Sequence, residues 1–76
     1  MSFRTHCESL GIKLLRDDIE YIKHCLQPYS KTHYRVILET YVEVWLDAMG
    51  KCDIVYQKQN KGRFAANSWL RNVLCI

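Results

Sequence analysis

The chain has 76 residues, of which 49% are hydrophobic and 25% charged, with three glycines and one proline. This length allows one small domain over residues 1–76, and so few turn-forming residues favour helices over a sheet. No run reaches the roughly 18 apolar residues that a membrane span needs, and the N-terminus lacks the apolar core of a signal peptide. These exclusions predict a cytoplasmic protein that does not enter a membrane.

Charge is unevenly distributed along the chain. Residues 1–50 hold six Lys/Arg and seven Asp/Glu, a net charge of −1, whereas residues 51–76 hold five Lys/Arg and one Asp, a net charge of +4. Cysteines occur at positions 7, 25, 52 and 75, and in a reducing cytosol we expect them to be thiols. Two His-Cys dipeptides raise the question of zinc, but neighbours on a helix diverge by about 100°, so we expect no metal site and no cofactor.

The first predicted helix covers residues 15–27, where apolar residues recur at helical spacing: Leu15, Ile19, Ile22 and Leu26. Asp17 and Asp18 fall in its first turn, where negative charge favours the helix dipole, and Pro28 ends it. The preceding segment is interrupted by Gly11 and is either an extended arm or a short helix.

A longer second helix is predicted over residues 31–49, with Ser30 as its N-cap and Gly50 as a left-handed C-terminal cap. Its apolar arc is wide enough to contact two neighbours. The opposite side carries an acidic ridge of Glu39, Glu43 and Asp47. This ridge is interpreted either as a solvated face, or as a partner surface or counter-charge for Arg63 and Arg71.

The third predicted helix covers residues 61–74, with Asn60 as its N-cap. One face of it should turn inward: Ala65, Ala66, Trp69, Leu70 and Val73. The pattern as a whole predicts an all-α fold, a small three-helix domain.

Catalysis is not indicated by any motif. The chain has no Ser-His-Asp order, no glycine-rich phosphate loop and no HExxH helix. Asp17–Asp18 and His24–Cys25 are adjacent pairs whose side chains should diverge on a helix. We therefore expect a protein that is not an enzyme.

The outer side of the third helix is the candidate binding surface. Its residues, with the lysine just before it, are Lys58, Asn60, Lys61, Arg63, Phe64, Asn67 and Arg71. Arginine and asparagine contact phosphates and base edges, and an exposed aromatic can stack or enter a partner's pocket. Three interpretations stay open: a solvated basic exterior with Phe64 tucked under residues 51–60, a protein-partner surface, and a nucleic-acid surface.

Two segments, YSKTHYRVILETYVEVWLDAM and YQKQNKGRFAANSWLR, together resemble a group of short proteins encoded by bacteriophages, prophages and related mobile elements. The shared pattern is a Trp-Leu-x-x-Met turn followed by Asn-x-Gly-Arg-x-Ala-Ala-Asn-x-Trp-Leu-Arg, and it covers roughly residues 28–71. The resemblance implies an origin in a mobile element, and by analogy a protein that binds and redirects host or phage machinery.

From these features the predicted function is a non-enzymatic binding module that binds and modulates a protein of host or phage nucleic-acid machinery. The alternative is a protein that binds nucleic acid directly through its basic C-terminal helix. A homodimer is a companion hypothesis, because a chain this short gains stability by burying more apolar surface.

Overall fold

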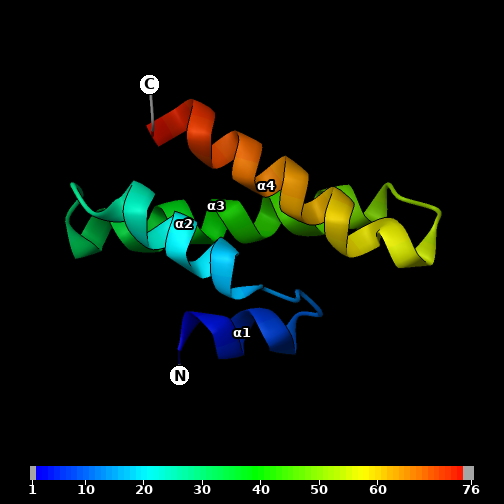
Figure 1. Cartoon of the computed structure of the whole chain (residues 1–76). Helices are drawn as coiled ribbons and strands as arrows, with labels where there is room; N and C mark the ends of the chain where they lie inside the picture. The colour runs from blue at the N-terminus through cyan, green and yellow to red at the C-terminus, as the bar shows by residue number, and fades with distance from the viewer. Residues whose placement is uncertain (1, 75–76) are drawn as a thin grey trace.

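The computed structural model describes residues 2–74, which form helices and no strand (Figure 1). The elements are α1 (Phe3–Ser9), α2 (Arg16–Leu26), α3 (Lys31–Gly50), the 3-10 turn η1 (Val55–Gln57) and α4 (Lys58–Leu74). The all-α prediction is confirmed. The prediction of three helices is wrong, because a fourth, α1, precedes the predicted set.

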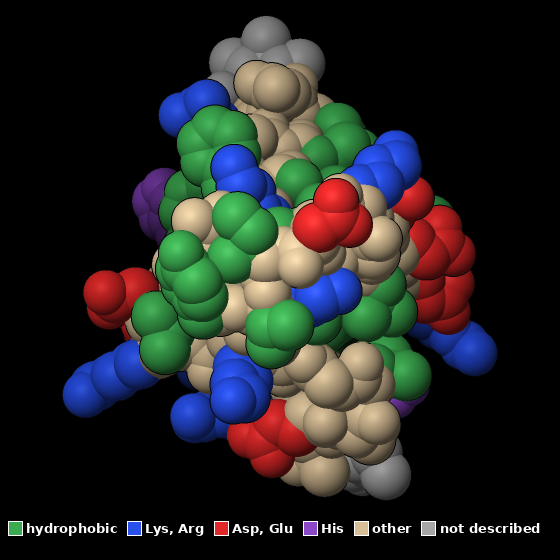
Figure 2. Space-filling view, turned by 90° about the vertical axis from the view of Figure 1, so that its right-hand side faces the viewer, with side chains coloured by type: hydrophobic (Ala, Val, Ile, Leu, Met, Phe, Trp, Pro, Cys, Tyr) green, Lys and Arg blue, Asp and Glu red, His purple; other side chains and the backbone are tan. Residues whose placement is uncertain are grey.

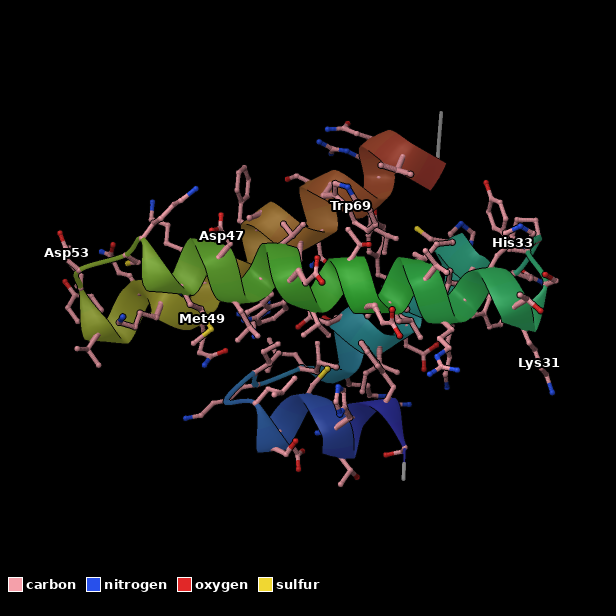
Figure 3. The ribbon with its side chains drawn as sticks, turned by 180° about the vertical axis from the view of Figure 1, so that it is seen from behind. Lys31, His33, Asp47, Met49, Asp53 and Trp69 are labelled. Atoms are coloured by element: carbon pink, nitrogen blue, oxygen red, sulfur yellow. The ribbon has the colours of Figure 1, made fainter. Side chains whose placement is uncertain are left out.

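The long helices α3 and α4 form an antiparallel hairpin, which is the most extensive helix-to-helix contact among the described residues (Figure 1). Tyr41 and Trp45 of α3 meet Ala66 and Leu70 of α4, and all four residues are fully buried. Trp69 is half-buried on the side of α4 that faces α3 (Figure 3). Val73, which was expected to face inward, is exposed, because α4 crosses α3 at an angle and its last turns diverge from it (Figure 1).

Helix α1 is only seven residues long, so its sequence has too few turns for a periodic pattern to stand out. The Ser2 hydroxyl caps it by accepting from the Thr5 N–H at 3.2 Å. Its Phe3 ring lies 6.5 Å from the Tyr41 ring, edge to face. Gly11, with φ of 83°, adopts the left-handed conformation that ends the helix.

Two predicted helix caps differ from the structure, whereas Ser30 is the N-cap of α3 as expected. Gly50 is not a left-handed cap; it is the last residue of α3, and Lys51 follows it as a C-cap with right-handed conformation. Asn60 is not an N-cap, since α4 already begins at Lys58. The Lys58 ammonium donates to the Met49 carbonyl at 3.3 Å, which also accepts from the Cys52 N–H at 3.2 Å, so both donors satisfy the C-terminal end of α3.

Gly62 of α4 packs directly against the Trp45 side chain of α3. A Cβ at this position would lie 2.5 Å from Nε1 of the Trp45 indole and slightly closer to its Cδ1. The indole is fully buried, so it has no room to move away. Only glycine lets the two helices approach this closely.

Gly62→Ala should therefore destabilise the fold. Overpacking against a buried ring costs about 1–3 kcal/mol and outweighs the gain of up to about 1 kcal/mol in helix propensity. Urea unfolding followed by circular dichroism measures the change. The matched control is Gly50→Ala, whose Cβ meets nothing within 4 Å; it should be neutral or slightly stabilising. Equal midpoints for the two variants would show that the contact with Trp45 is not restrictive.

Candidate partner interface on the fourth helix

The seven predicted site residues divide into an inward and an outward group. Arg63 and Asn67, expected to face outward, turn toward α2 and α3 and are only partly exposed. Lys58 reaches back to the end of α3. Asn60, Lys61, Phe64 and Arg71 are exposed. We call Asn60, Lys61, Phe64, Ser68 and Arg71 the outer strip.

The inward group meets the Asp18 carboxylate of α2, the only buried charged side chain among residues 2–74. Its Oδ2 accepts from Nε of Arg63 at 2.7 Å, and its Oδ1 from Nδ2 of Asn67 at 3.1 Å. Oδ2 also accepts from the Leu15 backbone N–H at 2.9 Å, which fixes the first turn of α2. The Asn67 carbonyl oxygen in turn accepts from the Tyr41 hydroxyl at 2.6 Å. One polar network thus joins α2, α3 and α4.

Arg63 is further fixed by two more hydrogen bonds. Its Nη1 donates to Oδ1 of Asn60 at 2.9 Å, and its Nη2 donates to the Lys13 carbonyl at 2.8 Å. The guanidinium also lies 5.2 Å from the centre of the Trp45 ring, a cation–π distance. Asp18 balances the charge of Arg63, and each nitrogen of its guanidinium donates a hydrogen bond within the protein. Arg63 therefore stabilises the fold and is less available to bind a ligand.

Gln59 of α4 holds the α1–α2 connection in the same region. Its Oε1 accepts from the Lys13 N–H at 3.0 Å, and its Nε2 donates to the Gly11 carbonyl at 2.7 Å. Through these hydrogen bonds the first turn of α4 holds the α1–α2 connection in place. Sequence spacing could not show this, because the partners lie 46 and 48 positions apart.

Phe64 faces solvent, with 75% of its surface exposed. The interpretation in which it is tucked under residues 51–60 is therefore wrong. Because Gly62 and Ala66 face the core, the helix directs Phe64, two positions away from each of them, to the solvent side. A rigid helix thus presents a large apolar ring to water, which is typical of an interaction site when polar groups surround it.

The outer strip borders a shallow hollow of about 480 Å³ between α2 and α4. Five predicted site residues line it, together with two that the sequence did not single out: Asn60, Arg63, Phe64, Asn67, Arg71, Tyr21 and Ser68. Helical spacing alone would have suggested Ser68, one turn beyond Phe64, whereas Tyr21 joins only through the packing of α2 on α4.

The acidic ridge of α3 does not pair with Arg63 or Arg71. Glu39 lies 3.4 Å from Arg35, and Asp47 lies 2.9 Å from Lys51, each pair within α3 and its last turn and exposed to water. Asp47 projects from α3 into solvent (Figure 3). The counter-charge of Arg63 is Asp18 instead, and such exposed pairs within one helix add little stability.

A second apolar feature lies where α3 passes into α4, at the three successive residues Ile54, Val55 and Tyr56. Val55 is 79% and Tyr56 81% exposed. Figure 2 looks onto this end of the molecule and shows hydrophobic side chains interspersed with Lys and Arg. In the sequence these residues are visible as an apolar run without helical spacing. That run alone did not predict that their side chains would be exposed.

The most apolar groove, of about 570 Å³, lies between α2, α3 and Phe3. Its floor includes Ile19, Tyr34 and Leu38, and its rim mixes Glu20, Lys23 and His24. One acid, Glu20, and one base, Lys23, line it, so the groove favours no partner of one charge. By contrast, the charged side chains of the outer strip, Lys61 and Arg71, are both positive.

The His-Cys dipeptides divide between interior and surface. Cys7 and Cys25 are buried, whereas His6 and His24 are exposed, so neither dipeptide directs two ligands to one point. Burial raises the pKa of the Cys7 thiol to about 11, which keeps it protonated and unreactive at neutral pH. Within residues 2–74, no three His, Cys, Asp or Glu side chains gather as a metal site. No helix in that range has both the length and the hydrophobicity to cross a membrane.

Comparison with protein-family models, with curated proteins and with solved structures gives no match for this chain. The resemblance to phage and mobile-element proteins stays a prediction. The choice of a contact surface therefore depends on the geometry of the described residues.

Removing the network centre should destabilise the protein strongly. Asp18→Ala leaves the Arg63 charge partly buried without its partner, a loss of about 3–5 kcal/mol. Asp18→Asn, which keeps an acceptor but loses the charge, should lie between Asp18→Ala and the wild type. Urea unfolding measures all three, and Asp17→Ala, an exposed neighbour in the same turn, should change stability by less than about 0.5 kcal/mol. Similar losses for Asp17→Ala and Asp18→Ala would contradict the assigned role.

Burial of Cys7 predicts a loss of stability in alkali. The folded-state pKa is raised from 9.0 to about 11, so the folded state holds this proton more tightly than the unfolded state does. The contribution is complete below pH 9.0 and is lost as the pH rises toward about 11. The unfolding free energy should therefore fall across this window, and Cys7→Ala should make the fall shallower. The control is Cys52→Ala, at a half-buried thiol; an equal effect of the two variants would contradict the assignment to Cys7.

Proposed function

We propose that this protein is a non-enzymatic binding module of a phage or other mobile element, which binds a protein of host or phage nucleic-acid machinery. The contact surface is the outer strip, with Phe64 at its centre. The observation that carries the proposal is the 75% exposure of Phe64 on a helix that the Asp18 network holds rigidly in place. The mobile-element origin and the choice of machinery rest on the sequence resemblance alone.

Phe64 has the properties of a binding hot spot. Hot spots are enriched in large rigid side chains that become fully desolvated in the complex. Little conformational entropy is lost when such a ring is already fixed on a helix. Lys61 and Arg71 flank it at i−3 and i+7, so the apolar centre has a polar, positively charged rim.

Direct nucleic-acid binding is the second candidate, and the exposed Lys61 and Arg71 favour it. The two residues best suited to reading base edges, Arg63 and Asn67, are engaged with Asp18. Two exposed cations neutralise about two phosphates, which supports only weak binding with a shallow salt dependence. Anisotropy titrations with mixed duplex and single-stranded DNA and RNA at low and physiological salt test this candidate. Tight binding with a steep log-linear salt slope would favour it over the protein partner.

Phe64→Ser should abolish partner capture without unfolding the protein. Loss of a hot-spot ring reduces affinity on the order of tenfold or more, whereas an exposed residue contributes little to the fold. The measurement is quantitative affinity purification from cells that carry the element, with melting temperatures recorded in parallel.

Val36→Ser is the matched control for that experiment. Val36 is 64% exposed, but it lies on α3, outside the outer strip. This variant should retain the partners that Phe64→Ser loses. Retention of the same partners by both variants, or their loss from both, would refute the assigned surface.

The homodimer stays a companion proposal, and sedimentation of the purified chain over a range of concentrations tests it. An oligomer that persists in Phe64→Ser would place the dimer contact outside the outer strip.

A further inference from the structure

The hollow beside Phe64 has a lining of one charge sign. It contains Arg63 and Arg71, together with side-chain amides, hydroxyls and two aromatic rings, but no Asp or Glu. The Asp18 carboxylate that balances Arg63 is 5% exposed and belongs to the interior. A ligand that enters the hollow therefore meets cations and hydrogen-bond donors with no accessible carboxylate among the lining residues.

The cations of the outer strip are available for pairing. The four ion pairs found among the described residues involve neither Lys61 nor Arg71. On α1 and α3, by contrast, the exposed acids Glu8 and Glu39 each pair with an arginine one turn earlier. The outer strip thus combines uncompensated positive charge with an exposed aromatic ring.

The chemistry of these groups selects the partner. An arginine fork pairs bidentately with a carboxylate, and a lysine adds a second, less directional contact. The Phe64 ring requires an apolar pocket or side chain next to that carboxylate. A nucleic acid would supply anions but would draw affinity mainly from the number of phosphates neutralised, which is here about two. A protein segment with acidic and apolar side chains side by side satisfies both the ring and the cations.

We propose that the outer strip recognises an acidic, apolar protein segment, in which an Asp or Glu pairs with Arg71 while an adjacent aromatic or aliphatic side chain packs on Phe64. This inference rests on the proposed function and specifies its partner class. Lys61 provides a second contact to acidic groups and contributes to the rate of association, as charges at the rim of an interface do.

Random-peptide display on the immobilised full chain tests the inference, because it selects ligands by affinity alone. The baits are the wild type, Lys61→Glu with Arg71→Glu, Phe64→Ser, and Val36→Ser as the control. Peptides enriched on the wild type should carry Asp or Glu beside an aromatic or aliphatic residue. Their affinity, measured by anisotropy with synthetic copies, should fall about tenfold or more for the charge-reversed bait and for Phe64→Ser, but not for Val36→Ser. Replacing their acids by Asn and Gln should cause a similar loss.

Selection on the charge-reversed bait should yield basic apolar peptides, since the sign of the strip is inverted. Failure to enrich any peptide, or enrichment of neutral or basic peptides on the wild type, would overturn the inference. Peptides that ignore the charge reversal but lose binding to Phe64→Ser would also overturn it, while leaving the proposed surface intact. Peptides that bind every variant as tightly as the wild type would overturn both the acidic-segment inference and the proposed contact surface. A mixed-sequence single-stranded DNA could also bind the wild type more tightly than any selected peptide and lose this binding on charge reversal. That result would show that the ligand of the outer strip is nucleic acid and not an acidic protein segment.

Discussion

A single buried carboxylate determines how three helices meet in this protein. Asp18 would be costly in the interior without partners, because a desolvated charge needs both a counter-ion and hydrogen bonds. Arg63 supplies the counter-ion, and Asn67 and the Leu15 backbone supply further donors. Since Asn67 also accepts from Tyr41, the orientation of α4 about its own axis is tied to α2 and α3 together.

That orientation decides what α4 presents to solvent. Gly62, Ala66 and Leu70 must face α3, and Arg63 with Asn67 must face Asp18. Positions one turn apart on the remaining side, such as Phe64, Ser68 and Arg71, are then left outward by helical geometry. Interior and surface are thus coupled, and a change that rotated α4 to improve its packing would also move the Phe64 ring.

The apolar spacing of the sequence was sufficient to predict α2, α3 and α4, and the inward side of α4 at Ala66 and Leu70. A helical pattern that repeats over several turns is supported by many residues at once, so a single exception does not obscure it. It was insufficient for α1, which is too short to repeat, and for Gly50, which is the last helical residue of α3 and not a left-handed cap. The exposure of Phe64 is consistent with its predicted place on the outer side. The inward turn of Arg63 and Asn67 could not be predicted, because their partner lies 45 and 49 positions away and no local pattern encodes such a pairing.

The same separation orders the folding of the chain. Helices α3 and α4 are neighbours along the sequence, so their hairpin closes a short loop at a small entropic cost. The contact between Asp18 and Arg63 closes a loop of 45 residues, so it costs more loop-closure entropy than the hairpin does. We therefore expect the contacts of Asp18 to form late in folding, so that substitutions at Asp18 accelerate unfolding more than they slow folding.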